Sequence, residues 1–84
     1  MTDSPLFRRP DGRSLSEDHH LFRNSRGKFV IRATVDRGAR FTGQRITVQT
    51  GTHDINVARR IRDAVVMGWI KAGCLTRDIV LSDA

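Results

Sequence analysis

The strongest constraint on the fold is a strand-like alternation in the stretch GKFVIRATVDRG, from Gly27 to Gly38. Its apolar residues of one parity are Phe29, Ile31, Ala33 and Val35, and the other parity holds Lys28, Val30, Arg32 and Thr34. Successive side chains of a strand point to opposite faces of a sheet, so the first set is predicted to face a core. The second set would face water or a binding partner.

Two further strands are predicted beside this one. The stretch QRITVQT, from Gln44 to Thr50, alternates in the same way, with Arg45, Thr47 and Gln49 on the polar side. A short edge strand is predicted from Leu21 to Asn24, followed by a turn at NSRG, because Asn, Ser and Gly favour chain reversal. The three segments together favour an antiparallel sheet with one apolar and one basic face.

The hydrophobic period changes after residue 50. Apolar residues then recur every three or four positions, which predicts one face of a helix from about Ile55 to Ala72: Ala58, Ile61, Val65, Trp69 and Ala72. Thr52 or Asp54 can cap its start and Gly73 can end it. Arg59 and Arg60 are expected on the solvated side. Arg62 is expected near the edge of the stripe, where its stem can pack while its charged head stays in water. The fold class is therefore α+β, a three-stranded antiparallel sheet packed against one C-terminal amphipathic helix.

The two ends of the chain have weaker signals. Residues 1–20 contain two Pro, one Gly and mixed charges without a sustained period, which predicts a disordered tail before a single small domain over 21–84. His19 and His20 are expected to be incidental polar residues of that tail. The segment 74–84 has an apolar group at Ile79, Val80 and Leu81 that fits either a strand or a coil.

Charge suggests the kind of partner. The net charge is +6. Residues 1–20 hold three arginines and four acids, whereas residues 21–84 hold twelve basic residues and five acids. A basic domain of this size attracts phosphate backbones, and arginine makes bidentate contacts with phosphate and with guanine. Thirteen of the fifteen basic residues are Arg, which a GC-rich genome would also produce.

Several functional classes find no support in the sequence. One Cys, Cys74, cannot form an internal disulfide, and no spacing of His, Cys and acids resembles a metal site. No catalytic set of Ser, His and Asp or paired carboxylates is evident, so we expect no enzyme and no cofactor. No apolar run approaches the roughly 20 residues that span a bilayer, and the first ten residues lack a signal-peptide core. We expect a cytoplasmic protein, nucleoid-associated if it binds DNA.

Three short motifs carry a resemblance to a known family. They are Gly27-Lys28-Phe29 at the second strand, Gly51-Thr52-His53-Asp54 before the helix, and Ala58 to Asp63 within it. With the order of three strands and a helix, they resemble the ethylene-response-factor or Apetala-type DNA-binding domain over about residues 21–72. The arm-binding N-terminal domains of tyrosine recombinases are similar in architecture. The resemblance implies that the exposed sheet face lies in the major groove of DNA.

The candidate DNA-binding residues follow from the resemblance and from strand parity. The resemblance places seven of them on the exposed face: Asn24, Arg26, Lys28, Arg32, Thr34, Thr47 and Gln49. Parity adds Arg45, and the hairpin stretch DRGAR adds Arg37 and Arg40 as phosphate contacts. The expected function is thus a duplex-DNA-binding module, a regulator or recombination accessory. The alternative is a small interaction module that binds an acidic protein or itself, favoured if Val30 joins a continuous apolar patch. The oligomeric state stays open.

Overall fold

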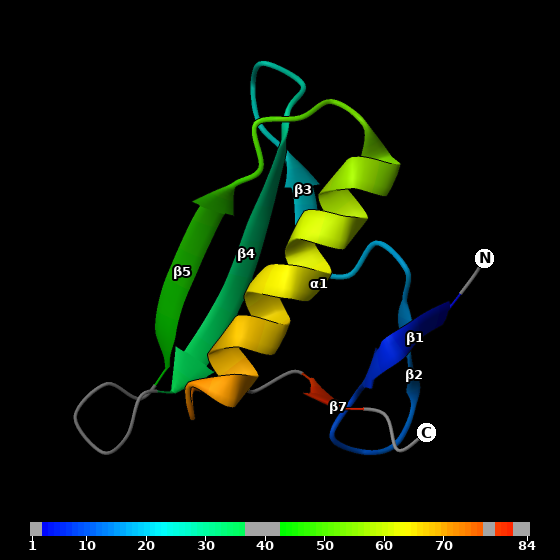
Figure 1. Cartoon of the computed structure of the whole chain (residues 1–84), viewed down its shortest axis with the longest axis vertical. Coiled ribbons are helices and arrows are strands. Elements are labelled where there is room, and N and C mark those ends of the chain that lie inside the picture. Colours follow the sequence, from blue (N-terminus) through cyan, green and yellow to red (C-terminus); the bar gives the residue numbers. More distant parts are fainter. Residues whose placement is uncertain (1–2, 37–42, 77–78, 82–84) are drawn as a thin grey trace.

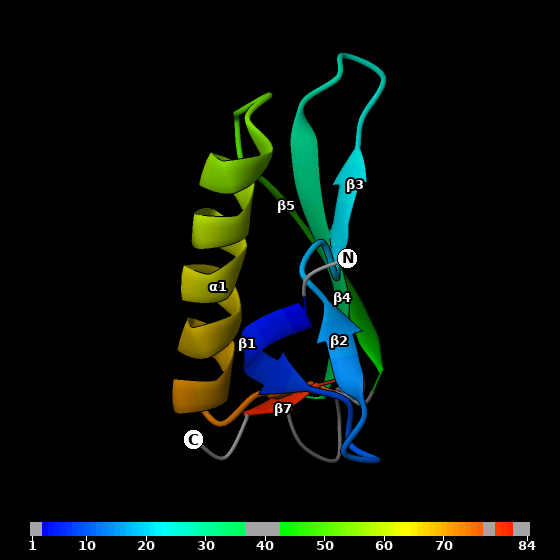
Figure 2. The same cartoon turned by 90° about the vertical axis from the view of Figure 1, so that its right-hand side faces the viewer.

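A computed structural model of the chain describes residues 3–36, 43–76 and 79–81. Its central sheet contains β3 (Leu21–Arg23), β4 (Phe29–Asp36) and β5 (Gln44–Gln49), all antiparallel in the order β3-β4-β5. One helix in the described residues, α1 (Ile55–Lys71), lies along one face of this sheet at a small angle to β4 (Figures 1 and 2). The predicted fold class, a three-stranded antiparallel sheet packed against one helix, is confirmed.

The ends of α1 follow from local chemistry. The Asp54 carboxylate accepts hydrogen bonds from the backbone N–H groups of Asn56 and Val57, which would otherwise lack partners in the first turn. At the other end, Gly73 has a φ of 82°, a left-handed conformation that Gly adopts without steric cost. The helix ends at Lys71, one residue before the predicted end, and Ala72 is its C-cap. No helix in the described part of the chain is long and apolar enough to cross a membrane.

The buried face of α1 differs from the predicted stripe by a small rotation. Its buried residues are Ala58, Arg62 and Val66, spaced by four, while Ile61, Val65 and Trp69 are half-buried and Ala72 is exposed. The prediction missed this because it searched for apolar side chains, and the centre of the face is an arginine with 2% exposure. Arg62 was expected at the edge of the stripe with its charged head in water, and this expectation is wrong, because the whole side chain is buried.

A second, smaller sheet was not expected. It consists of β1 (Asp3–Arg8), β2 (Ser14–Ser16) and β7 (Val80–Leu81), in the order β2-β1-β7. Residues 3–20, interpreted from sequence as a disordered tail, therefore form two strands and their connections instead. Figures 1 and 2 show this sheet beside the C-terminal half of α1. We call it the small sheet.

The small sheet is held to the helix by an apolar cluster. Phe7 of β1, Val66 of α1 and Ile79 are each exposed by 2% or less and contact one another in one buried cluster. Leu15, Met67, Trp69 and Ile70 pack around it. A single buried Phe contributes on the order of 3–5 kcal/mol to stability, which is enough to order a short segment that has a weak sequence signal. This contact could not be predicted from sequence, because the apolar residues of 1–20 are isolated among polar ones and show no hydrophobic period.

The C-terminal segment forms two very short strands. β6 (Leu75–Thr76) pairs with Val35 and Asp36 of β4, on the same edge where β3 pairs with residues 29–31. Arg32, Ala33 and Thr34 thus lie between β3 and β6 without a strand partner on that edge. The Arg32 N–H donates instead to the His20 carbonyl, at 2.9 Å. This interruption in the sheet edge helps to shape the site described next.

Candidate functional site

Five of the predicted binding residues share one face of the central sheet. In the register of β4 and β5, Arg32 lies opposite Thr47, Thr34 opposite Arg45, and Val30 opposite Gln49. Directly opposite residues of an antiparallel pair point to the same side. The other side of β4 holds the buried residues Ile31, Ala33 and Val35, and α1 packs on that side (Figure 2). We call the side with Arg32, Thr34, Arg45, Thr47 and Gln49 the outer face.

The outer face has positive charges that no acid neutralises within the described residues. Arg32 and Arg45 are exposed, and neither forms an ion pair there. The Arg32 guanidinium lies over the Phe22 ring, with 5.4 Å from Cζ to the ring centroid, which holds the charge in place without neutralising it. By contrast, the acids Glu17 and Asp18 pair with Arg59 on the helix. The fold thus separates paired from unpaired arginines.

The turn between β3 and β4 places three further candidates at one end of the sheet. The Asn24 Oδ1 accepts from the backbone N–H groups of Arg26 and Lys28, at 2.9 and 3.0 Å. Gly27 has a φ of 79°, as this reversal requires. Asn24 therefore organises the turn with its side-chain oxygen, Arg26 is exposed, and Lys28 is half-buried. Arg37 and Arg40, the two candidates of the β4–β5 connection, lie outside the described residues.

Apolar exposure on the outer face is limited. Val30 was the residue whose exposure would favour a protein partner, and it is only 4% exposed. Phe22, which lies opposite Val30 in the register, is 48% exposed. The other large apolar side chains that are exposed in the described part are Leu6, Val80 and Leu81, on the small sheet. The described outer face therefore has one exposed ring and no continuous apolar patch.

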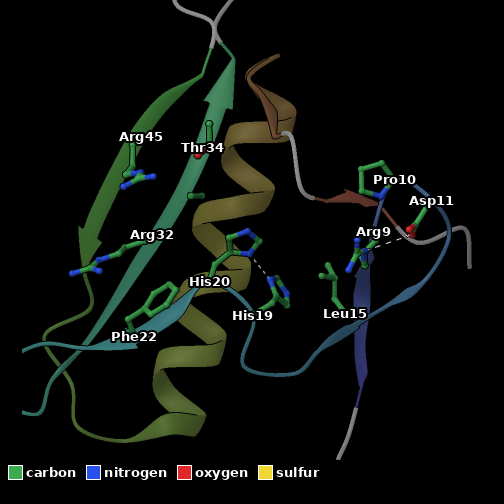
Figure 3. A pocket seen from close by; sticks show the side chains of 11 residues that line it. Arg9, Pro10, Asp11, Leu15, His19, His20, Phe22, Arg32, Thr34 and Arg45 are labelled. Carbon is green, nitrogen blue, oxygen red and sulfur yellow. Dashed lines mark hydrogen bonds and ion pairs between the residues drawn. The ribbon is translucent and has the colours of Figure 1, made fainter.

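A cleft of about 830 Å³ lies between the outer face and the β1–β2 hairpin. Figure 3 shows Phe22, Arg32 and Arg45 on the sheet side, and Arg9, Pro10, Asp11 and Leu15 on the hairpin side. His19 and His20 lie between the two sides. The sequence analysis missed this cleft, because it depends on the hairpin that was interpreted as a tail.

The two histidines are part of the folded structure, which corrects the expectation that they are incidental. His19 is 8% exposed, its ring lies edge-on to Phe7 with centroids 5.7 Å apart, and its Nδ1 is 2.7 Å from the His20 Nδ1. One ring must donate a proton in that hydrogen bond and the other must accept it. Burial, together with the positive charge of Arg62 and the neighbouring His20, lowers the pKa of His19 to about 3.

Two helix arginines hold the β2–β3 connection in place. The Arg62 Nη1 donates to the carbonyls of Glu17 and His19, at 2.7 and 2.9 Å, and its Nε pairs with Asp63 at 2.9 Å. Arg59 donates from Nε to the Asp18 carboxylate at 2.6 Å, a hydrogen bond that raises the pKa of Arg59. Arg60 is exposed as predicted. These contacts position His20 and the start of β3 at the cleft.

Comparisons of the chain with protein-family models, with curated proteins and with solved structures found no match in any of the three. Among the described residues, no group of three His, Cys, Asp or Glu side chains could hold a metal ion. The outer face and the cleft are therefore the features of the molecule that indicate a function.

Proposed function

We propose that the protein binds duplex DNA, with the outer face of the central sheet in the major groove. The observation that carries this proposal is the register of β4 and β5, which gathers Arg32, Arg45, Thr47 and Gln49 on one face opposite the helix. A two-stranded ribbon fits a major groove about 12 Å wide, because neighbouring strands are only about 4.8 Å apart. Arginine pairs with guanine edges and phosphates, and glutamine pairs with adenine.

The surroundings of the face agree with this binding mode. Arg26 and Lys28 lie at one end of β4, where they can contact phosphates beside the groove. On the hairpin, Arg9 and Arg13 pair only loosely with Asp11, at 3.7 and 3.8 Å, and their side chains are 54% and 80% exposed. An ethylene-response-factor or Apetala-type mode of binding, or that of a recombinase arm-binding domain, is proposed on the same grounds. The protein would act as a regulator or recombination accessory at the nucleoid.

The rival function is an interaction module for an acidic protein or for a second copy of the chain. In its favour, β5 pairs only with β4 among the described strands, so its other edge could add a strand. Against it, Val30 is buried and Arg45 lies on that edge strand, where a charge hinders pairing. The observations favour nucleic acid over protein.

Replacement of Arg32 by Ala should weaken duplex binding by about 5- to 100-fold, the range for loss of one bidentate base contact. The unfolding midpoint should change little, because the Arg32 side chain is exposed. Affinity is measured by fluorescence anisotropy with a random-sequence duplex at two salt concentrations. In parallel, a ¹⁵N chemical-shift titration should show salt-sensitive shifts at Arg32, Thr47 and Gln49.

The matched control is Arg60→Ala, which removes the same charge from the exposed side of α1. Its affinity should stay within about twofold of the original, since only non-specific attraction is reduced. Equal losses in both variants would assign the binding to net charge rather than to the outer face. Unchanged affinity of Arg32→Ala would remove Arg32 from the interface.

A further inference from the structure

The cleft beside the outer face differs in shape from the flat remainder of that face. A flat face suits a duplex, but this cleft has two walls and a volume of about 830 Å³, within the range of about 300–1,000 Å³ for small-ligand pockets. One wall is the central sheet and the other is the β1–β2 hairpin (Figure 3). The cleft is open to solvent, and its volume is enough to hold a compact group.

An exposed ring lies on the sheet wall. Phe22 is 48% exposed, and the Arg32 guanidinium lies over it at 5.4 Å. A half-exposed Phe loses part of the stabilisation that burial would give it, and it offers a π-face to a ligand. Aromatic rings and guanidinium planes are the two side-chain surfaces on which unpaired bases stack. Leu15 on the hairpin wall adds apolar surface across the cleft.

Positive charge surrounds this ring. Three arginines line the cleft: Arg9, Arg32 and Arg45. Thr34, which lies opposite Arg45 in the register, also lines it. The one acid of the lining, Asp11, already faces two arginines, Arg9 and Arg13. A ligand for this cleft should combine a flat ring with negative charge, and a nucleotide has both.

The base of such a nucleotide must be unpaired. Inside a duplex, both faces of a base are stacked on its neighbours, so neither face can reach Phe22. We infer that the cleft binds nucleotides with an unstacked base, supplied by a single strand or as free nucleotides. The base stacks on Phe22 and Arg32, and Arg9 and Arg45 contact the phosphates. This activity goes beyond duplex binding. It shares Phe22, Arg32 and Arg45 with the outer face, but the hairpin wall with Arg9 belongs to the cleft alone.

The test compares three probes by their affinities: the single-stranded oligonucleotide dT8, thymidine monophosphate, and a random-sequence duplex. The key variant is Phe22→Leu, which keeps an apolar side chain against Val30 but removes the π-face. It should weaken dT8 binding by about 5- to 100-fold, the effect of losing one stacked base. It should weaken duplex binding less, because Arg32, Arg45, Thr47 and Gln49 of the outer face all remain. Circular dichroism confirms that the variant folds.

The control variant is Leu6→Ala, which removes an exposed apolar side chain outside the cleft. It should leave the affinity for dT8 unchanged. Tight binding of dT8 with weak binding of the monophosphate identifies a single strand as the source, whereas similar affinities identify free nucleotides. The inference is overturned if dT8 and the monophosphate both fail to bind, or if Phe22→Leu binds them like the original protein. Loss of duplex binding alone would contradict only the proposed function.

Discussion

His19 is a buried histidine whose pKa differs between the folded and the unfolded chain. Its ring contacts Phe7 and His20, and the Arg62 guanidinium donates to its carbonyl. None of these contacting groups is an acid that would stabilise an imidazolium, and the acids of the β2–β3 connection and of α1, Glu17, Asp18 and Asp63, pair with Arg59 and Arg62. The pKa of His19 is therefore lowered to about 3, from about 6.5 in the unfolded chain.

Stability should consequently fall as the pH falls below about 6.5. In that window the unfolded chain binds a proton at His19 that the folded protein does not, so the free energy of unfolding rises with pH. From pH 7.5 to pH 5 the expected loss is about 2 kcal/mol, before most carboxylates titrate. Urea denaturation at each pH measures it.

Two variants test whether the pH dependence of stability comes from His19. His19→Gln should remove most of this pH dependence whatever its effect on absolute stability, while His53→Gln, at an exposed position, should keep it. A pH profile of His19→Gln that parallels the original would show that another group titrates.

Residue-level prediction from sequence succeeded where neighbours alternate and failed where contacts are distant. The parity of β4 and β5 correctly predicted that Arg32 and Thr47 share an exposed face. Val30 has the same parity, yet it is 4% exposed, and Phe22 lies opposite it in the register. Phe22 itself was not singled out, because a lone aromatic in a three-residue strand has no period. Its exposure becomes visible only when β3 is placed beside β4.

At the scale of elements, α1 packs on the two sheets and also holds the β2–β3 connection, and its hydrophobic pattern predicts only the packing. Its apolar residues pack on the sheets, while Arg59 and Arg62 hold the β2–β3 connection through Glu17, Asp18 and the His19 carbonyl. The limits of the helix could be predicted from Asp54 and Gly73, which act locally. The buried Arg62 could not, because its acceptors are carbonyls more than forty residues away in the chain.

Replacement of Arg62 by Met should lower the free energy of unfolding by about 2–4 kcal/mol. Met keeps much of the apolar volume, but the Glu17 and His19 carbonyls lose their donor and Asp63 loses its partner. Chemical denaturation measures the change. Arg60→Met is the control at an exposed position and should stay within about 0.5 kcal/mol. If the two variants are equally stable, the carbonyl contacts of Arg62 do not support the fold.

At the scale of the whole molecule, the small sheet joins the two ends of the chain to the helix. β1 pairs with β7, so residues 7 and 8 lie beside residues 80 and 81. The central sheet and helix, which sequence predicted, are built from segments adjacent in the chain. In the small sheet, β1 pairs with the nearby β2 and with β7, more than seventy residues away, and contacts of the second kind have no local signal. The cleft was missed because the β1–β2 hairpin, which forms one of its walls, has no sustained hydrophobic period.

The small sheet and the helix share the buried cluster of Phe7, Val66 and Ile79, so they should unfold together. Phe7→Ala should lower the free energy of unfolding by about 3–5 kcal/mol, since Phe7 is fully buried against Val66 and Ile79. Leu6→Ala, at the exposed neighbouring position, should cost less than about 1 kcal/mol.

Unfolding is followed by Trp69 fluorescence, which reports on the Phe7 cluster, and by far-ultraviolet circular dichroism, which reports mainly on α1. Because Val66 and Trp69 belong both to the helix and to that cluster, the two curves should coincide and shift together in Phe7→Ala, as a two-state transition requires. A fluorescence transition that moves alone would make the small sheet a separate, weaker unit. An unchanged unfolding midpoint in Phe7→Ala would instead show that residues 3–8 form a disordered tail, as expected from sequence. The cleft would then have no hairpin wall.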